Sequence, residues 1–352
     1  MFKFRNIDDL IPGRFERVGM LKGKRWYIDL AHKQNALFKP KRFEFGDRKV
    51  FCANHYGEFM GYLLAENSGI PVCKAELAHL SKYYPNIHKE RNNGTPVEKD
   101  GCLTYSKLAP EDELEPGKTV IEYFSREYEN RFKDLTINDI NKVNASDNLE
   151  VMLSALEARI RKFYRDNNNQ VSSSTVDNIV KENRKKAIQM MVYDCLYGNN
   201  DRHDENWSLI RNKENIGLYE LYDNERVLGL HENQNVITKA INDGNVDEIS
   251  EKMFFSRMRV PGEKKTHSTY KDVLNYLMQN YKPETLEAVN IALKSNTIEK
   301  IQEELNLCEG LPKCYIDFAV DMYSSRYNFA KQLYKNKDAI SHENKDDENI
   351  DR

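Results

Sequence analysis

The sequence lacks any long apolar segment. No stretch of its 352 residues approaches the roughly 20 apolar residues that a membrane-spanning helix needs, and 31% of the residues are charged. An acidic pair, Asp8 and Asp9, lies where a signal peptide would have its apolar part. We therefore expect a protein made in the cytoplasm and not docked on a membrane. Secretion by a route that needs no cleavable signal peptide stays compatible with this sequence.

A strong charge bias and cysteine clusters are also missing. Lys and Arg number 53 against 56 Asp and Glu, so the net charge of -3 creates no basic field that would capture nucleic acid. The six cysteines are dispersed, with neither a Cys-x-x-Cys pair nor zinc-site spacing. We expect free, mostly buried thiols and no nucleic-acid partner.

Apolar and aromatic residues are plentiful. The chain is 39% hydrophobic and contains 20 Tyr and 15 Phe, which is typical of a folded protein. Its length exceeds that of one compact core, so we expect two lobes. The nearly all-polar segment 336–352 predicts a disordered, charged tail.

The first lobe, residues 1–124, is expected to combine a small sheet with one helix. Aromatic and β-branched residues between Gly and polar turns predict the strands, and helical spacing of apolar residues predicts a helix at about 54–68. The expected strands are Arg14–Met20, Arg25–Leu30, Asn35–Lys39, Pro71–Leu80 and Gly101–Lys107.

The second lobe, residues 125–335, is expected to be helical. Periodic apolar positions predict a helix over 149–163. The run Ser172–Thr175 precedes a long helix that extends to about Tyr197, with Ser174 and Asp177 at capping-box spacing. Further helices are expected near 247–258, 268–281, 284–294, 296–306 and 313–335. A polar loop, 198–206, interrupts this pattern. Two strands, 207–211 and 216–222, follow the loop, and the second ends at an acid, Asp223.

Three polar residues in this interruption have spacing typical of phosphoryl transfer. Asp201 and Asn206 are five residues apart on one loop, and a hairpin then returns Asp223. That chemistry needs a carboxylate for the attacking hydroxyl, oxygen ligands for Mg²⁺, and a cation that grips the phosphates. The pattern therefore indicates an ATP-dependent phosphotransferase.

The same residues resemble a known family. The stretch Asn200–Leu209, Asn-Asp-Arg-His-Asp-Glu-Asn-Trp-Ser-Leu, resembles the catalytic loop of HipA-like Ser/Thr protein kinases. The strand Asn35–Lys39 is similar to the family's strand with a phosphate-binding Lys, and the Glu58 helix with Gly69–Leu77 is similar to the segment that follows it. The resemblance extends from about residue 12 to 335. The form Asp-Arg-His-x-x-Asn also occurs in phosphoinositide kinases.

The resemblance implies an α+β, two-lobed protein-kinase-like fold with ATP between a small sheet-and-helix lobe and a larger helical lobe. It implies that Asp201 is the catalytic base, that Asn206 and Asp223 bind Mg²⁺, and that Lys39 binds the nucleotide phosphates. The resemblance further implies that Glu58 pairs with Lys39 and that His203 assists proton transfer. Nucleotide contacts are expected from the phosphate loop, at Gly19, Lys22 and Gly23, and from the hinge near Thr104–Leu108, at Tyr105 and Ser106.

Simpler interpretations stay open for several of these residues. Lys39 precedes Pro40 and is also compatible with an exposed strand end. Arg202 and His203 are compatible with a purely structural role in the loop. The run Ser172–Thr175 reads as a helix cap or as an autophosphorylation site.

The implied activity is Mg²⁺-dependent transfer of the γ-phosphoryl group of ATP to protein hydroxyls, including those of another copy of the chain. The resemblance is to small bacterial members of the family, which implies virulence and translocation into host cells. Two alternatives remain: a lipid kinase, and an inactive toxin-like module that binds an antitoxin-like partner.

Overall fold

A computed structural model describes residues 1–12, 24–41, 43–44, 50–81, 99–109, 111–136, 147–167, 171–253, 257–261 and 268–336. The chain forms two compact units, and each is discontinuous in sequence. Unit 1 comprises Met1–Pro110, Leu221–Val246 and Glu299–Asp321, and unit 2 comprises Glu111–Glu220, Asp247–Ile298 and Met322–Arg352. The sequence predicts contiguous lobes that meet near residue 124, and this boundary stays a prediction.

Unit 1 is built on a six-stranded sheet with strand order β1-β7-β8-β4-β3-β2. Strands β1 and β7 pair in parallel, and the other neighbours are antiparallel. The strands of this sheet are β1 Arg5–Asn6, β2 Ile11–Pro12, β3 Arg25–Asp29, β4 Gln34–Pro40, β7 Ala75–His79 and β8 Asp100–Ser106. A separate two-stranded sheet consists of β5 Phe43–Glu44 and β6 Val50–Phe51. The helices are α1 Asn54–Asn67, η2 Val227–Gly229, α7 Gln234–Asn242, α11 Ile298–Asn306 and the first part of α12 Lys313–Lys335.

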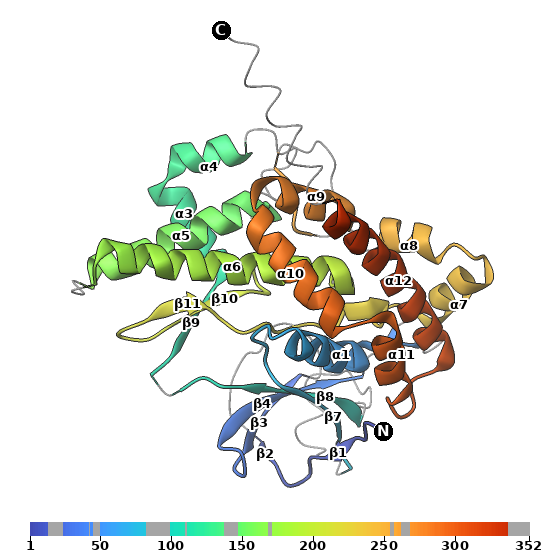
Figure 1. Ribbon diagram of the computed structural model, residues 1–352. Helices are drawn as coiled ribbons and strands as arrows, with labels where there is room; N and C mark the ends of the chain where they lie inside the picture. Colours follow the sequence, from blue (N-terminus) through green and yellow to red (C-terminus); the bar gives the residue numbers. More distant parts are fainter. Residues whose placement is uncertain are drawn as a thin grey trace. The chain divides into compact units, whose positions relative to one another are not determined.

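The two faces of this sheet carry different side chains, because successive residues of a strand point to opposite faces. Helix α1 packs against β7 and β8 (Figure 1). Lys39 and Thr104 both reach Glu58 on α1, so they face the helix. The opposite face carries a buried apolar cluster that includes Phe38 and Tyr105. The sheet therefore directs its charged lysine towards α1 and its aromatic rings away from it.

Most of the strands expected in the first lobe are present. Strands β3, β4, β7 and β8 and helix α1 confirm the corresponding predictions. The expected strand Arg14–Met20 lies outside the described residues.

Unit 2 is mainly helical and includes a three-stranded sheet with order β11-β10-β9. Helix α6 contacts α5, α9 and α10 (Figure 1). Its elements are β9 Glu113–Pro116, α3 Gly117–Glu127, α4 Glu129–Thr136, α5 Leu149–Asp166, α6 Ser173–Tyr197, β10 Ser208–Arg211, β11 Ile216–Leu218, α8 Val246–Met253, α9 Tyr270–Asn280, α10 Lys282–Ser295 and the remainder of α12. The predicted hairpin after the polar loop is confirmed by the antiparallel pairing of β10 with β11.

The ends of α6 set the position of the polar loop that follows it. The helix begins one residue after Ser172, whose hydroxyl accepts a hydrogen bond from the Thr175 amide. The expected capping box of Ser174 and Asp177 is therefore wrong, because Ser174 already lies within the first turn. The helix ends at Tyr197, and the next residue, Gly198, has a left-handed φ of 74° that glycine adopts at little cost.

Several other features differ from the expectation or extend it. The helix expected near 247–258 ends at Met253, and β9 and α7 were not expected at all. All six cysteines are free, and five of them are buried. Within the part of the chain that the structure describes, no helix is long and apolar enough to cross a membrane.

Candidate active site

Lys39 is the centre of a buried ion cluster in unit 1. It lies near the end of β4, is only 4% exposed, and places Nζ 2.9 Å from Glu58 Oε1 and 2.8 Å from Asp223 Oδ1. Burial works against the charged ammonium, but the charges of Asp223, Glu58 and Glu225 outweigh it and raise the pKa of Lys39. The exposed strand-end interpretation of Lys39 is therefore wrong.

The backbone around Asp223 holds its carboxylate beside Lys39. Leu221 forms a parallel bridge with Val72, with the Leu221 amide donating to the Pro71 carbonyl over 2.9 Å. Asp223 then adopts a left-handed φ of 57°, which Asp tolerates better than most residues. The segment Leu221–Val246 belongs to unit 1, so Asp223 lies in the same unit as Lys39.

Helix α1 approaches this turn closely because residue 57 is glycine. A Cβ atom on Gly57 would lie 2.2 Å from the carbonyl oxygen of Glu225. The next residue on the helix is Glu58, which is 2% exposed and also accepts a hydrogen bond from Thr104 Oγ1 over 3.3 Å. The small residue therefore allows Glu58 to reach the Lys39 ammonium.

A second lysine contacts the same carboxylate. Lys24 Nζ lies 3.5 Å from Asp223 Oδ1, and its side chain is only 9% exposed. Lys24 lies within the expected phosphate loop, residues 18–25, but the sequence gives no reason to select it over Gly19, Lys22 and Gly23. The phosphate-loop candidates Gly19, Lys22 and Gly23 lie outside the described residues.

The two hinge candidates lie at the end of β8. The Tyr105 ring is 1% exposed, and its hydroxyl donates to Glu76 Oε2 over 2.9 Å and accepts from Arg5 Nη1 over 2.5 Å. Burial and the neighbouring Glu76 raise the pKa of Tyr105. This network links β1, β7 and β8, and Ser106 ends the strand beside it. Nucleotide contacts of Tyr105 and Ser106 stay predictions.

The polar loop of unit 2 is held by its own hydrogen bonds. The Asn206 side-chain nitrogen donates to the Asp201 carbonyl over 2.6 Å, and the backbone amide of His203 donates to the same carbonyl over 2.9 Å. Because the nitrogen of the Asn206 amide is used within the loop, the oxygen of that amide is the atom suited to a metal ion.

Arg202 connects this loop to helix α6 through a buried ion pair. It is 1% exposed, and its guanidinium donates to Asp194 Oδ2 over 3.0 Å, to Asp194 Oδ1 over 3.1 Å and to the Asn206 carbonyl over 2.8 Å. His203 Nδ1 accepts a hydrogen bond from the Glu205 amide over 3.2 Å, so the proton of the neutral ring lies on Nε2. The structural role expected for Arg202 is thus present, and proton transfer by His203 stays a prediction.

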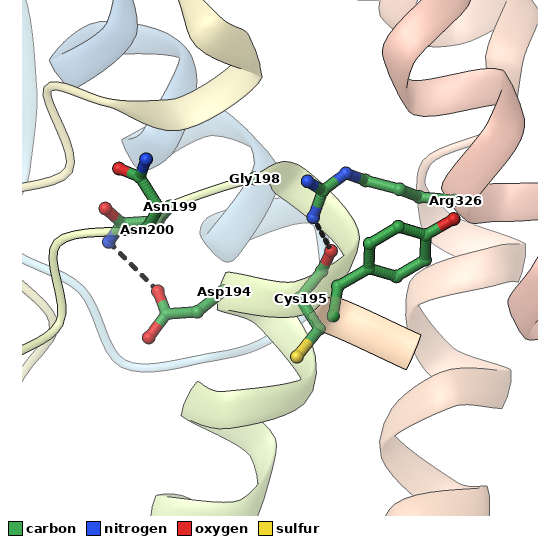
Figure 2. Close-up of a pocket in the computed structure, with 7 residues that line it drawn as sticks. Asp194, Cys195, Gly198, Asn199, Asn200 and Arg326 are labelled. Atoms are coloured by element: carbon green, nitrogen blue, oxygen red, sulfur yellow. Dashed lines mark hydrogen bonds between the residues drawn. The ribbon is translucent and has the colours of Figure 1, made fainter. Parts of the chain in front are cut away.

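A small pocket lies beside the start of the loop (Figure 2). Arg326 of α12 lines it, donates to the Cys195 carbonyl, and lies 4.3 Å from the centre of the Tyr270 ring. Burial lowers the pKa of Arg326 to about 10. A cation near the last turn of a helix is favourable, so Arg326 stabilises the end of α6 where the loop begins.

Two charged residues from elsewhere in the chain, Arg257 and Asp147, lie at the polar loop. Arg257 Nε lies 3.1 Å from Asp201 Oδ1, and the Arg257 amide donates to the Asn200 carbonyl over 3.4 Å. Asp147 precedes α5, where burial and the charge of Asp204 raise its pKa to about 6. Neither Arg257 nor Asp147 was singled out in the sequence, because only the folded chain brings them to the loop.

The structure thus gathers the predicted site residues in two groups. Unit 1 brings together Lys39, Glu58 and Asp223, and unit 2 brings together Asp201 and Asn206 with His203 between them. Within the described ranges, no group of three or more His, Cys, Asp or Glu could hold a metal ion by itself. Binding of Mg²⁺ by Asn206 and Asp223 stays a prediction; that ion is commonly bound by one or two protein oxygens together with substrate phosphates.

Solved structures of two bacterial proteins are similar to this chain. The crystal structure of the Helicobacter pylori proinflammatory kinase CtkA matches with a TM-score of 0.67 and 14% identity, over 96% of this chain and 99% of that chain. HipA of Shewanella oneidensis MR-1, solved with HipB and its operator DNA, matches with a TM-score of 0.48 and 13% identity, over 90% of this chain and 65% of that chain.

The first of these likenesses shows that the chain has a kinase-like α+β fold, as the sequence predicts. No curated protein matches the sequence. The family model for the HipA-like C-terminal domain matches residues 21–305. The chain therefore belongs to the HipA-like C-terminal domain family, and the resemblance of its polar loop to that family is confirmed.

Proposed function

We propose that the chain is an ATP- and Mg²⁺-dependent Ser/Thr protein kinase. In this proposal Asp201 accepts the proton of the attacking hydroxyl, Asn206 and Asp223 supply oxygen ligands for Mg²⁺, and Lys39 binds nucleotide phosphates. The acceptor hydroxyls belong to a protein substrate and to further copies of the chain.

The observation that carries the proposal is the placement of Lys39. A buried lysine costs several kcal/mol unless carboxylates compensate its charge, and here Glu58 and Asp223 both do so within 3 Å. Replacing this cluster with apolar residues would often be neutral for stability. The arrangement is readily explained if the ammonium and the Asp223 carboxylate act on a nucleotide and its metal.

The catalytic loop offers matching chemistry. The Asp201 side chain is 17% exposed, so it is accessible to a hydroxyl while much of it is shielded from water. Its backbone is fixed by the bonds from Asn206 and His203, which favours one orientation of the carboxylate. Bound Mg²⁺ would neutralise charge on the phosphates, and the protein would supply the orientation of the hydroxyl.

Lys24 extends this assignment within unit 1. It shares the Asp223 carboxylate with Lys39, so one carboxylate faces two ammonium groups. Mg²⁺ bound to Asp223 would compete with both lysines, and the phosphates of the nucleotide would then become their partners. We assign Lys24 as a second phosphate-binding cation.

The test is transfer of label from γ-labelled ATP to protein in the presence of Mg²⁺. Wild-type protein should label itself and a mixed Ser/Thr acceptor protein, whereas Asp201→Asn and Asp223→Asn should reduce incorporation at least about a hundredfold. Asp177→Asn and Asp317→Asn are matched controls, because both carboxylates lie in exposed ion pairs, one in each unit. The controls should retain wild-type labelling.

Two further arms separate this proposal from its alternatives. Wild-type enzyme should label added Asp201→Asn protein, since that variant keeps its acceptor hydroxyls while lacking the base. Phosphoinositide vesicles should remain unlabelled. Equal incorporation by wild type and both site variants would refute the proposal, and labelling of the vesicles alone would make the chain a lipid kinase.

A further inference from the structure

Arg257 contacts the carboxylate that the proposed function makes the catalytic base. Its Nε atom lies 3.1 Å from Asp201 Oδ1, and its side chain is 47% exposed. The backbone beside it is fixed, because the Arg257 amide donates to the Asn200 carbonyl and the Arg259 amide donates to the Asp147 carbonyl over 2.8 Å. A half-exposed guanidinium is thus held beside Asp201 by an anchored segment.

The Arg257 side chain is 47% exposed, whereas that of Asp201 is 17% exposed. Water therefore competes for the guanidinium of this ion pair, which weakens the pair and leaves it open to exchange. The anchored backbone keeps the guanidinium near Asp201 even when that pair breaks. Arg257 can therefore change partners without leaving the site.

The loop itself supplies no comparable cation. Arg202 is the arginine next to Asp201, but it is 1% exposed and its donors are engaged by Asp194 and the Asn206 carbonyl. The Nδ1 atom of His203 lies 3.2 Å from the Glu205 amide, within the loop itself. Phosphoryl transfer spreads negative charge over the equatorial oxygens, and a positioned cation there lowers the barrier.

We propose that Arg257 supplies this positive charge as a catalytic residue. The acceptor oxygen must lie within hydrogen-bond distance of the Asp201 carboxylate, and the phosphorus must lie within bonding distance of that oxygen during transfer. A guanidinium 3.1 Å from the same carboxylate is therefore within one side-chain movement of the transferred group. Arg257 is bound to Asp201 before substrate binds and to the phosphoryl oxygens during transfer.

Phosphoryl transfer here forms one O–P bond and breaks another. A lone pair of the acceptor oxygen forms the new O–P bond, and the proton of that hydroxyl passes to the Asp201 carboxylate. The bond between the γ-phosphorus and the bridging oxygen breaks, and its electron pair stays on ADP. The Arg257 guanidinium keeps its protons throughout and donates hydrogen bonds to the transferred group.

The inference rests on the proposed function, and its test uses the full-length chain with Mg²⁺ and γ-labelled ATP. Arg257→Ala should lower kcat about 10²- to 10³-fold while the KM for ATP changes less than about threefold. Arg257→Lys should recover part of the rate, and guanidinium ion added to Arg257→Ala should raise kcat in a saturable way. A merely structural arginine would give no such chemical rescue.

Arg161→Ala is the matched control. Arg161 is 43% exposed, and it pairs with Glu157 and with Asp177 at the opposite end of α6. That helix has 25 residues and is therefore about 37 Å long, which separates Arg161 from the loop. This control should keep the wild-type kcat, and both variants should keep the wild-type unfolding temperature within about 2 °C.

The outcomes distinguish the inference from the function on which it rests. If wild type and Asp201→Asn incorporate equal label, the proposed function fails. If Asp201→Asn is inactive but Arg257→Ala matches wild type, only the role of Arg257 is refuted. A kcat for Arg257→Ala above that of wild type would also refute it, because Arg257 would then block Asp201. Loss of kcat without any rescue by guanidinium or by Arg257→Lys would likewise overturn it.

Discussion

Replacement of Lys39 by Met tests the ion cluster of unit 1. Met keeps most of the side-chain volume but removes the ammonium that Glu58 and Asp223 share. The change in the free energy of unfolding then measures the cost of leaving these two carboxylates without that cation. Glu58 is 2% exposed and would lose its cation, whereas Asp223 is 23% exposed and keeps Lys24 at 3.5 Å. The penalty should therefore come mainly from Glu58.

The size of the effect follows from the burial of the pair. Removing one partner of a buried ion pair costs about 3–5 kcal/mol, and the partial compensation at Asp223 favours the lower end. For a cooperative unit of this size, a loss of about 3 kcal/mol lowers the unfolding midpoint by about 6–12 °C. Glu58→Gln in the Lys39→Met background should recover at least about half of that loss, because it removes the unpaired charge.

Tryptophan fluorescence provides the assay, since the chain has two Trp residues, Trp26 in β3 of unit 1 and Trp207 in unit 2. In a Trp207→Phe background, Trp26 reports on unit 1 alone during urea and thermal unfolding. Lys313→Met is the control, because Lys313 is 68% exposed in an ion pair of the same unit. A loss below about 1 kcal/mol for Lys39→Met, or a further loss on adding Glu58→Gln, would refute this reasoning.

Three other perturbations test separate parts of the structure. The pKa of Asp147 is raised from 3.8 to about 6, so between these pH values the folded protein keeps a proton that the unfolded chain has released. The free energy of unfolding should therefore fall as pH rises from about 4 to 6. Asp147→Asn should remove that fall and raise the unfolding free energy at pH 7.5 by about 1 kcal/mol after solvent screening, and an unchanged pH profile would contradict it. Gly57→Ala should cost about 1–3 kcal/mol in urea unfolding, because its Cβ would lie 2.2 Å from the Glu225 carbonyl oxygen; wild-type stability would disprove that contact. Lys24→Ala should raise the KM for ATP about tenfold through loss of a charged phosphate contact, and an unchanged KM would exclude this role.

The parts of the fold that the sequence predicts well are those with strong local patterns. Local pattern predicts strand β4 and helix α1, and the family resemblance implies that Lys39 and Glu58 pair, which the structure shows. Asp223 was found from the hairpin before it. The left-handed turn that brings it to Lys39 was not predictable, because it depends on pairing of Leu221 with Val72, far away in sequence.

Other elements have weak local propensity for the structure that they adopt. Strand β9 has the sequence Glu-Leu-Glu-Pro, which lacks β-branched and aromatic residues, and it is a strand because it pairs with β10. Helix α7 contains Asn, Val, Ile and Thr, which are poor helix formers, so local preference did not reveal it.

The same limit applies to the site. Lys24 and Arg257 are ordinary surface residues by sequence, and only the fold shows that each contacts a predicted site carboxylate. A lysine beside a turn and an arginine near an expected helix end carry no local signal of function. Spacing identifies groups on one loop, such as Asp201 and Asn206, but not partners that arrive from elsewhere in the chain.

Single-turnover transfer of label from γ-labelled ATP by wild type and by Asp201→Asn, measured alongside their affinity for ATP, tests the kinase assignment. If Asp201 is the catalytic base, Asp201→Asn should bind ATP with Mg²⁺ as tightly as wild type but transfer the γ-phosphoryl group to protein about 10²- to 10⁴-fold more slowly. Equal transfer rates for the two proteins, or ATP binding without any transfer by wild type, would show that the chain is not a kinase of this kind.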